Sequence, residues 1–166
     1  PITNLYLSRI GATGELAAAT VAIAIVFSVP LGVLAAFHRN GPVDALAQLT
    51  SILFSALPSF WVALLGILLF AVVLHWLPAF GTPTANGIIL PAVVLALPTT
   101  ALLTRLTRAA MLDALSHEYV VTARAKGLRE ARVAWRHVLP NALVPIVTVL
   151  TLELANLMTG AAVVEY

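Results

Sequence analysis

Residues 118–128 read EYVVTARAKGL, and this short charged stretch stands between two long apolar runs. A polar segment flanked by runs long enough to cross a bilayer predicts a connection between two membrane-spanning helices. The apolar character extends through the chain, in which 61% of the residues are hydrophobic and 10% are charged. Soluble domains have roughly 25% charged residues, so the composition predicts an all-α integral membrane protein, a polytopic transmembrane helical bundle.

Four spans emerge when runs of about twenty apolar residues are sought between charged or turn-forming residues. The runs cover residues 16–37, 45–77, 88–111 and 141–163. The second run is too long for one perpendicular helix, so we expect a helix over residues 44–57, a bend at Pro58 and a continuation through the bilayer. One transmembrane domain over residues 1–166 is expected, and the abrupt ends predict that it is a piece of a longer protein.

The cationic side chains predict how the spans are oriented, because such residues favour the cytoplasmic side of a membrane. If successive spans cross the membrane in alternating directions, Arg9 is the only cationic residue placed on one side. The cationic residues placed on the other side are Arg39, Arg105, Arg108, Arg124, Lys126, Arg129, Arg132 and Arg136. The connection over residues 112–139 is therefore predicted to be cytoplasmic.

This cytoplasmic loop has a pattern of its own. Residues 118–126 are good helix formers, and Gly127 can end a helix. Apolar residues then recur at helical spacing, at Leu128, Ala131, Trp135, Val138 and Leu139. The pattern predicts two short helices joined at a glycine. A plainer alternative is that the loop only follows the positive-inside rule and binds lipid headgroups.

A resemblance favours a more specific role for the loop. The sequence YVVTARAKG, followed after a short interval by HVLPNAL, resembles the EAA loop of ABC-importer permeases. The similarity is greatest to the first permease type of the peptide/nickel branch, and it extends to PSFWVALLGILLFAVVLHWLPAFG, LTRLTRAAMLDAL and GAAVVEY. The resemblance implies the fold of a type I importer permease, whose coupling helix docks on an ATP-hydrolysing subunit.

Carried over position by position, the resemblance implies which residues couple to the ATPase. They are Tyr119, Thr122, Ala123, Arg124, Ala125, Lys126 and Gly127, with Leu139 and Pro140 where the loop re-enters the membrane. The small side chains are expected to let the helix lie deep in a partner's groove, while Arg124 and Lys126 supply ionic contacts at its edge. Val121 stands where many such permeases have glutamate, so no acidic contact is expected there.

The resemblance also implies the partners and the location of the chain. We expect a second permease, two ATP-binding subunits and an extracytoplasmic substrate-binding protein in the cell membrane of a prokaryote, with lipid contacts and no nucleic acid. The chain has no GxxxxGK[ST] phosphate loop, because GATGELAAAT lacks both the spacing and the lysine, so ATP and Mg are expected on the partner subunits. No cofactor, catalytic set or metal site is expected, since His38, His75, His117 and His137 are scattered.

Polar residues and bends inside the spans are candidates for the translocation path. They are Ser55, Pro58, Ser59, Thr99, Thr100, Glu153 and Asn156. Helix kinks whose freed carbonyls bind nearby hydroxyls, or packing against a partner permease, explain these residues equally simply. The resemblance implies dipeptide or oligopeptide substrates, with nickel as the alternative within the branch. An ion-coupled secondary transporter is the alternative outside it, although such a transporter has no use for a helix-glycine-helix loop.

Overall fold

The structure is a computed structural model that describes the backbone of residues 2–78 and 85–164, and the side chains of residue 11 and of residues 13–78 and 87–156. Within these ranges every regular element is helical, which confirms the predicted fold class. The elements are α1 (Ile2–Phe37), α2 (Pro42–Ala56), α3 (Ser59–Gly66), η1 (Ile67–Val73), α4 (Ala85–Leu115), α5 (Glu118–Ala125), α6 (Glu130–Arg132), η2 (Val133–Val138) and α7 (Leu139–Val164), of which η1 and η2 are π-helical.

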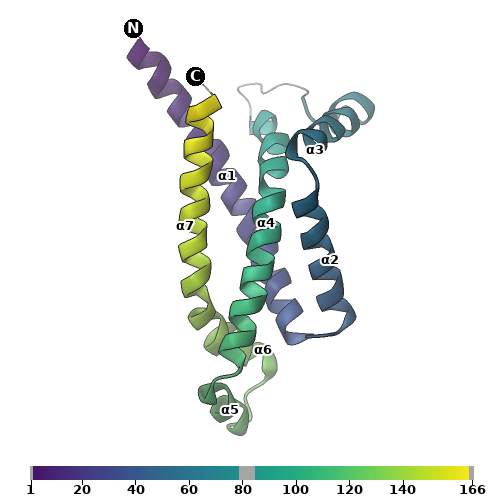
Figure 1. The fold of residues 1–166 in the computed structure, drawn as a ribbon, viewed down its shortest axis with the longest axis vertical. Coiled ribbons are helices and arrows are strands. Elements are labelled where there is room, and N and C mark those ends of the chain that lie inside the picture. Colours follow the sequence, from purple (N-terminus) through teal and green to yellow (C-terminus); the bar gives the residue numbers. More distant parts are fainter. Residues whose placement is uncertain (1, 79–84, 165–166) are drawn as a thin grey trace.

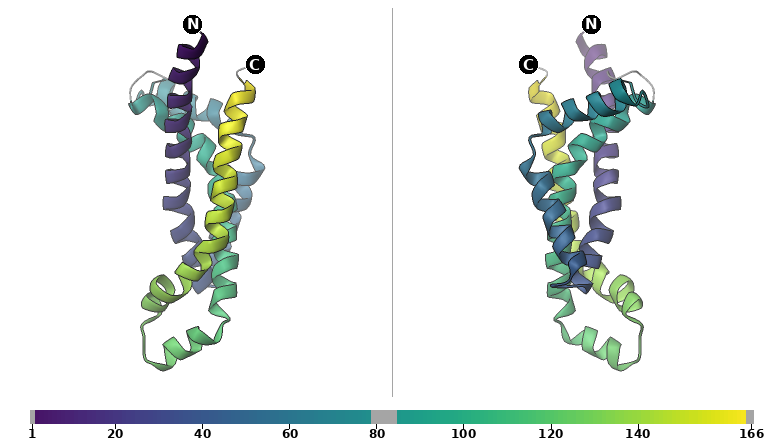
Figure 2. Two further views of the ribbon diagram at one scale, coloured as in Figure 1. Left: turned by 90° about the vertical axis from the view of Figure 1, so that its left-hand side faces the viewer. Right: turned by 90° about the vertical axis from the view of Figure 1, so that its right-hand side faces the viewer.

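The long helices run side by side along one axis, and both chain ends lie at the same end of the bundle (Figure 1). The turn between α1 and α2 lies at the opposite end together with α5, which projects beyond the bundle (Figure 2). We call this the α5 end. Arg39 and the cations of residues 124–136 are thus gathered at one end, as the charge bias predicts, whereas Arg105 and Arg108 lie within α4 itself.

Three continuous helical segments are long and apolar enough to cross a membrane. They are Thr13–Phe37, Gly87–Leu115 and Glu130–Asn156. The fourth predicted span is a bent pair, Pro42–Ala56 and Ser59–Val73, whose two halves meet at 96°. The four predicted spans therefore correspond to three continuous helical segments and, if the bent pair crosses as one span, a fourth broken one.

The predicted break at Pro58 is present, but the chain does not simply continue along the bundle after it. Leu57 and Pro58 both have extended backbones, with ψ angles of 127° and 129°. Proline disfavours the helical conformation of the preceding residue, which explains why α2 ends there. Because the chain resumes as a helix at 96°, α3 and η1 extend sideways from the bundle (Figure 1).

The predicted loop of two separate short helices is also different in the structure. Helix α4 runs to Leu115, and its helical path is unbroken through Pro98. The second predicted loop helix is continuous with the last span, because α6, η2 and α7 follow one another without a gap. The apolar periodicity after Gly127 belongs to the base of α7, and this boundary could not be seen in a pattern that stays helical throughout.

Small side chains line the seam where α1 packs on α4. At intervals of four along α1 they are Thr20, Ala24, Ser28, Gly32 and Ala36, all buried. A Cβ atom at Gly32 would lie 2.5 Å from Thr107 Cβ and 2.9 Å from the Thr104 carbonyl oxygen. Membrane helices without large side chains between them approach closely and gain van der Waals contact, so this seam explains why α1 and α4 form the central pair.

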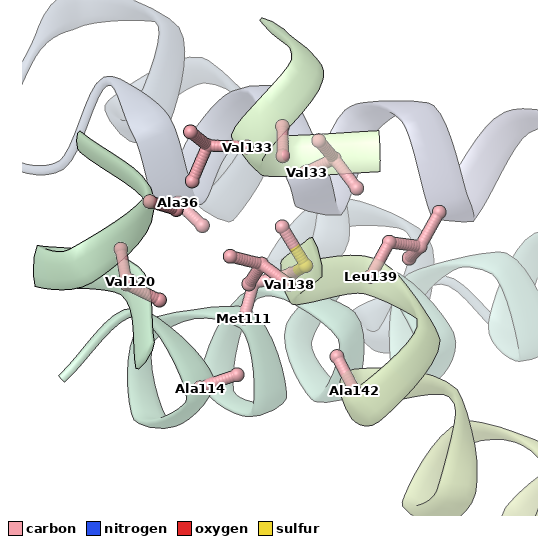
Figure 3. Packing of buried hydrophobic residues seen from close by; sticks show 11 residues of the cluster. Val33, Ala36, Met111, Ala114, Val120, Val133, Val138, Leu139 and Ala142 are labelled. Atoms are coloured by element: carbon pink, nitrogen blue, oxygen red, sulfur yellow. The ribbon is translucent and has the colours of Figure 1, made fainter. Parts of the chain in front are cut away.

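Two apolar clusters hold the bundle together. One lies in the middle of the bundle and contains Ala24, Ala96, Leu103 and Ile146. The other, which we call the basal cluster, lies at the α5 end and joins α1, α4, α5, η2 and α7. Its buried members are Val33, Ala36, Met111, Ala114, Val120, Ala123, Val133, Ala134, Val138, Leu139 and Ala142 (Figure 3).

Candidate functional site

The predicted helix that ends at Gly127 is present as α5, Glu118–Ala125. The Gly127 N–H donates to the Arg124 carbonyl at 2.9 Å, and the Leu128 N–H donates to the Ala123 carbonyl at 3.4 Å. Gly127 has a φ of 74°, the left-handed conformation that glycine adopts most readily. This pair of hydrogen bonds is the Schellman motif, so the sequence terminates α5 and redirects the chain within two residues.

One face of α5 is buried in the basal cluster. Val120 is 0% exposed and Ala123 is 6% exposed. In Figure 3 the side chain of Val120 points toward Met111 of α4 and Val138 of η2. Leu128, just past the glycine, packs against the same cluster. Helix α5 is therefore attached by apolar contacts to the ends of α1, α4 and α7.

This burial corrects the expected orientation of α5. Ala123, predicted to lie in a groove of another protein, packs inside this chain. Leu139 is likewise a buried member of the basal cluster, while Pro140 is exposed. A run of small residues marks close packing but does not reveal the partner, which explains why the sequence alone predicted the wrong neighbour for Ala123.

The opposite face of α5 is open to solvent. Val121, at 64% exposed, is the most accessible large apolar side chain on the helix, and Thr122 and Ala125 are exposed beside it. Tyr119 is 36% exposed, and its ring centroid lies 5.8 Å from that of His117. Lys126 is exposed where the helix ends. We call Val121, Thr122 and Ala125 the outer face; its side chains are small and mostly apolar, and the exposed Glu118 lies one turn before them on the same side of the helix.

An ion pair that the sequence analysis did not identify crosses the Gly127 turn. The guanidinium of Arg124 donates two hydrogen bonds to the Glu130 carboxylate, at 2.8 and 3.0 Å. The hydrogen-bonded carboxylate raises the pKa of Arg124. Arg124 thus binds α6 of its own chain rather than standing free for a partner. Glutamate six residues after an arginine across a helix-ending glycine is the sequence signal that could have identified this pair.

A second unanticipated ion pair lies inside the α5 end of the bundle. The guanidinium of Arg108 on α4 donates two hydrogen bonds to the carboxylate of Asp44 on α2. Its Nη2 donates to Oδ2 at 2.7 Å, and its Nε donates to Oδ1. The Asp44 side chain is only 2% exposed. The sequence analysis explained Arg108 by the positive-inside rule alone and predicted no ion-pair partner for it. Asp44 lies 64 residues away in the sequence, so spacing gave no sign of the pair. Only the folded arrangement of α2 and α4 reveals this pair.

The candidate path residues lie on separate helices. Ser55, Pro58 and Ser59 are exposed at the bend between α2 and α3, while Thr99 and Thr100 are buried in α4. Glu153 is half-buried and Asn156 exposed on α7. Ser59 lines an apolar groove between α3 and α4, whereas Thr100 lines a different one among α1, α2 and α4. The structure does not gather the path residues into one site.

Known proteins are similar in sequence to this chain over nearly its whole length. Residues 28–166 match the family described as "Binding-protein-dependent transport system inner membrane component". The chain is 38% identical to the oligopeptide transport system permease protein AppB of Bacillus subtilis, over 99% of this chain and 55% of that protein.

Two further relatives carry similar names. Identity is 36% to the glutathione transport system permease protein GsiC of Pectobacterium atrosepticum, over 99% of this chain and 54% of that protein. It is 38% to the dipeptide transport system permease protein DppB of Bacillus subtilis, over 91% of this chain and 49% of that protein. The chain spans about half the length of the curated relatives that it matches.

Proposed function

Because the chain belongs to the family of inner membrane components of binding-protein-dependent transport systems, we propose that it is a permease subunit of an ATP-driven importer and that α5 couples it to an ATP-hydrolysing subunit. The observation that carries the proposal is the two-sided construction of α5. One side is packed into the basal cluster, and the other side is an exposed outer face of small, mostly apolar side chains.

The outer face suits docking on another protein. Thr122 and Ala125 are small enough to let the helix axis come close to a groove wall, and Val121 adds an apolar contact. A helix in a groove is a common mode of protein recognition. Lys126 and Arg129, exposed beside the helix end, supply charges at the rim. Arg124 supports this surface indirectly, because its pair with Glu130 joins α5 to α6.

The inner face explains how docking at α5 affects the spans. Interdigitated apolar side chains move together, because separating them leaves voids that lose contact energy. A displacement of α5 by nucleotide-driven movement of its partner is therefore passed through Val120 and Ala123 to the ends of α1, α4 and α7. The spans then shift as rigid helices, a type of movement that opens and closes interfaces in many proteins.

The proposed substrates are peptides, since relatives named for oligopeptide, dipeptide and glutathione transport all match this chain. The assembly would contain a second permease, two ATP-binding subunits that carry ATP and Mg, and an extracytoplasmic substrate-binding protein. The candidate path residues would face the path from their separate helices when the second permease completes it. The α5 end would face the cytoplasm of the bacterial cell.

The outer face can be tested with two exposed alanines of the same loop, in the full-length protein within its transporter. Ala125→Trp enlarges the outer face, while Ala131→Trp makes the same change on α6. Overpacking a docked face costs roughly 1–3 kcal/mol, so Ala125→Trp should lower ATP-dependent uptake or recovery of the complex by about tenfold or more. Ala131→Trp should stay near the wild-type level.

The lipid-binding alternative gives the reverse ranking. If Ala125→Trp is harmless while Lys126→Glu and Arg129→Glu detach the loop from anionic vesicles and abolish uptake, α5 is a lipid-contacting loop rather than a docking helix. Uptake that persists without ATP but requires an ion gradient would point to a secondary transporter instead. Competition among a dipeptide, a tripeptide, glutathione and Ni²⁺ for uptake by the intact transporter identifies the substrate.

A further inference from the structure

Helix α2 is the one long helix that takes no part in the basal cluster, among the residues that the structure describes. Its buried side chains are Asp44, Ala47 and Ser51, all of them small or polar. Most of its large apolar side chains are instead exposed, including Leu46, Leu49, Ile52 and Leu53, while Phe54 is half-buried. Apolar contact therefore attaches α2 to the rest of the bundle weakly, and its strongest directional contact is the Asp44–Arg108 ion pair.

Asp44 joins three parts of the chain. Its Oδ2 atom accepts a hydrogen bond from the Asn40 backbone N–H at 2.9 Å, in the turn between α1 and α2. Its Oδ1 atom accepts from Gln48 Nε2, one turn further along α2, at 3.1 Å. Arg108 of α4 binds both oxygens. Asn40 has a φ of 62°, the left-handed conformation that asparagine adopts more readily than most residues, so the carboxylate also bonds to the backbone of a tight turn.

The ion pair adjoins the basal cluster on α4. Arg108 lies one helical turn before Met111, which is fully buried in that cluster beside Val120 of α5. Apolar contacts thus link α5 to α4, and the ion pair links α4 to α2 one turn further on. A bidentate ion pair fixes both the distance and the relative orientation of α2 and α4. Contacts made by alanine and serine side chains alone do not.

We propose that Asp44 and Arg108 are positioning residues that make α2, and with it the bent α3, follow α4 when α5 is displaced. This inference rests on the proposed coupling role of α5. The pair has no contact with nucleotide or substrate in this role. It converts a movement of α4 into an equal movement of α2, so that the side arm formed by α3 and η1 shifts together with the main bundle.

The test uses the full-length protein in its assembled transporter, with spin labels at Leu49 on α2 and Ala109 on α4, both exposed. Asp44→Ala combined with Arg108→Met removes the pair without leaving a buried lone charge, which favours normal folding. Ser51→Ala is the matched control, because Ser51 lies on the same buried face of α2 and, among the described residues, its hydroxyl donates a hydrogen bond only to the Ala47 carbonyl of its own helix.

In the wild type and in Ser51→Ala we expect the same narrow distance between the labels without nucleotide and after trapping with ATP and vanadate. In the double variant the distance distribution should broaden in both states and shift on trapping. Uptake per ATP hydrolysed should fall by about fivefold or more, the lower end of usual allosteric coupling, while ATP hydrolysis continues.

Two results would overturn the inference. In one, the double variant matches the wild type in label distance and in uptake per ATP, so that the pair has no positioning role. In the other, the wild-type distance itself changes on trapping, so that α2 does not follow α4. Failure of the proposed function looks different, because Ala125→Trp would then leave uptake and assembly intact whatever the labels report.

Discussion

Gly127 shows how far a single residue could be predicted. The sequence predicted a glycine that ends one short helix and joins it to another, and the structure has a φ of 74° there. Apart from its chain neighbours, no atom of the described residues lies within 4 Å of where a Cβ at this position would be. The requirement is conformational rather than steric. A β-branched residue at this φ is destabilised by steric clashes in the left-handed region, whereas asparagine tolerates this conformation better.

We therefore predict that Gly127→Val strains the turn by about 1–2 kcal/mol and uncouples the transporter while the spans remain inserted. Gly127→Asn, placed in the same open space, should retain most of the coupling. The measurement is stimulation of ATP hydrolysis by substrate-loaded binding protein in complexes of equal composition. Equal stimulation in the valine and asparagine variants would show that the positive φ is unimportant for coupling.

Ala123 shows what could not be predicted at the same scale. Its size was the correct signal for close packing, but the sequence could not distinguish packing within the chain from packing against another protein. Arg124 and Glu130 illustrate the same limit for charge. Propensity and spacing identify a helix and its end, whereas the face that is buried depends also on segments more distant in the sequence, here α1 and the base of α7.

At the scale of the helices, we predict that Gly32→Ala destabilises the α1–α4 seam. The added Cβ would meet Thr107 and a backbone carbonyl below 3.0 Å, so the helices must separate, at roughly 1–3 kcal/mol. Ser28→Ala, one turn away in the same seam, removes a buried hydroxyl that has no hydrogen-bond partner among the described residues, and should change stability by less than about 1 kcal/mol.

Unfolding of the purified protein by SDS in mixed micelles, followed by tryptophan fluorescence, checks both variants. Loss of stability in Ser28→Ala equal to that in Gly32→Ala would mean that the seam responds to any substitution rather than to added volume. The spacing of small residues along α1 was visible in the sequence. Its partner on α4 was not, because Thr104 and Thr107 are recognisable as the other half of the seam only when the helices are paired.

At the bend between α2 and α3, local chemistry determines where the helix breaks but not the angle of the break. Proline at position 58 marked the break, because the residue before a proline avoids the helical conformation. The angle of 96° was not predictable, since it depends on where α3 comes to rest. One contact that places it is Gly66, where an added Cβ would lie 2.9 Å from Leu90 Cδ1 of α4.

For the whole molecule, we predict that the full-length chain reconstituted alone takes up no peptide and hydrolyses no ATP. Within residues 1–166, three single spans and one bent pair leave the candidate path residues on separate helices, so a path for a polar solute needs further helices around them. The sequence also has no phosphate-binding loop. Proteoliposomes with the chain alone, and with the partner permease, ATP-binding subunits and binding protein added, provide the comparison. Uptake by the chain alone would contradict the proposed division of labour.

The basal cluster also imposes an order on biosynthesis. Its members extend from Val33 in the first helix to Ala142 in the last, so the cluster cannot close while the ribosome is still making α5. Helix α5 leaves the ribosome before its inner face has a complete surface to pack on, because Val133, Val138 and Ala142 follow it in the chain. If α5 docks as proposed, its docking surface is complete only after the base of α7 has been made. An unfinished chain would then expose the inner face of α5 before it could offer a stable outer face to an ATP-binding subunit.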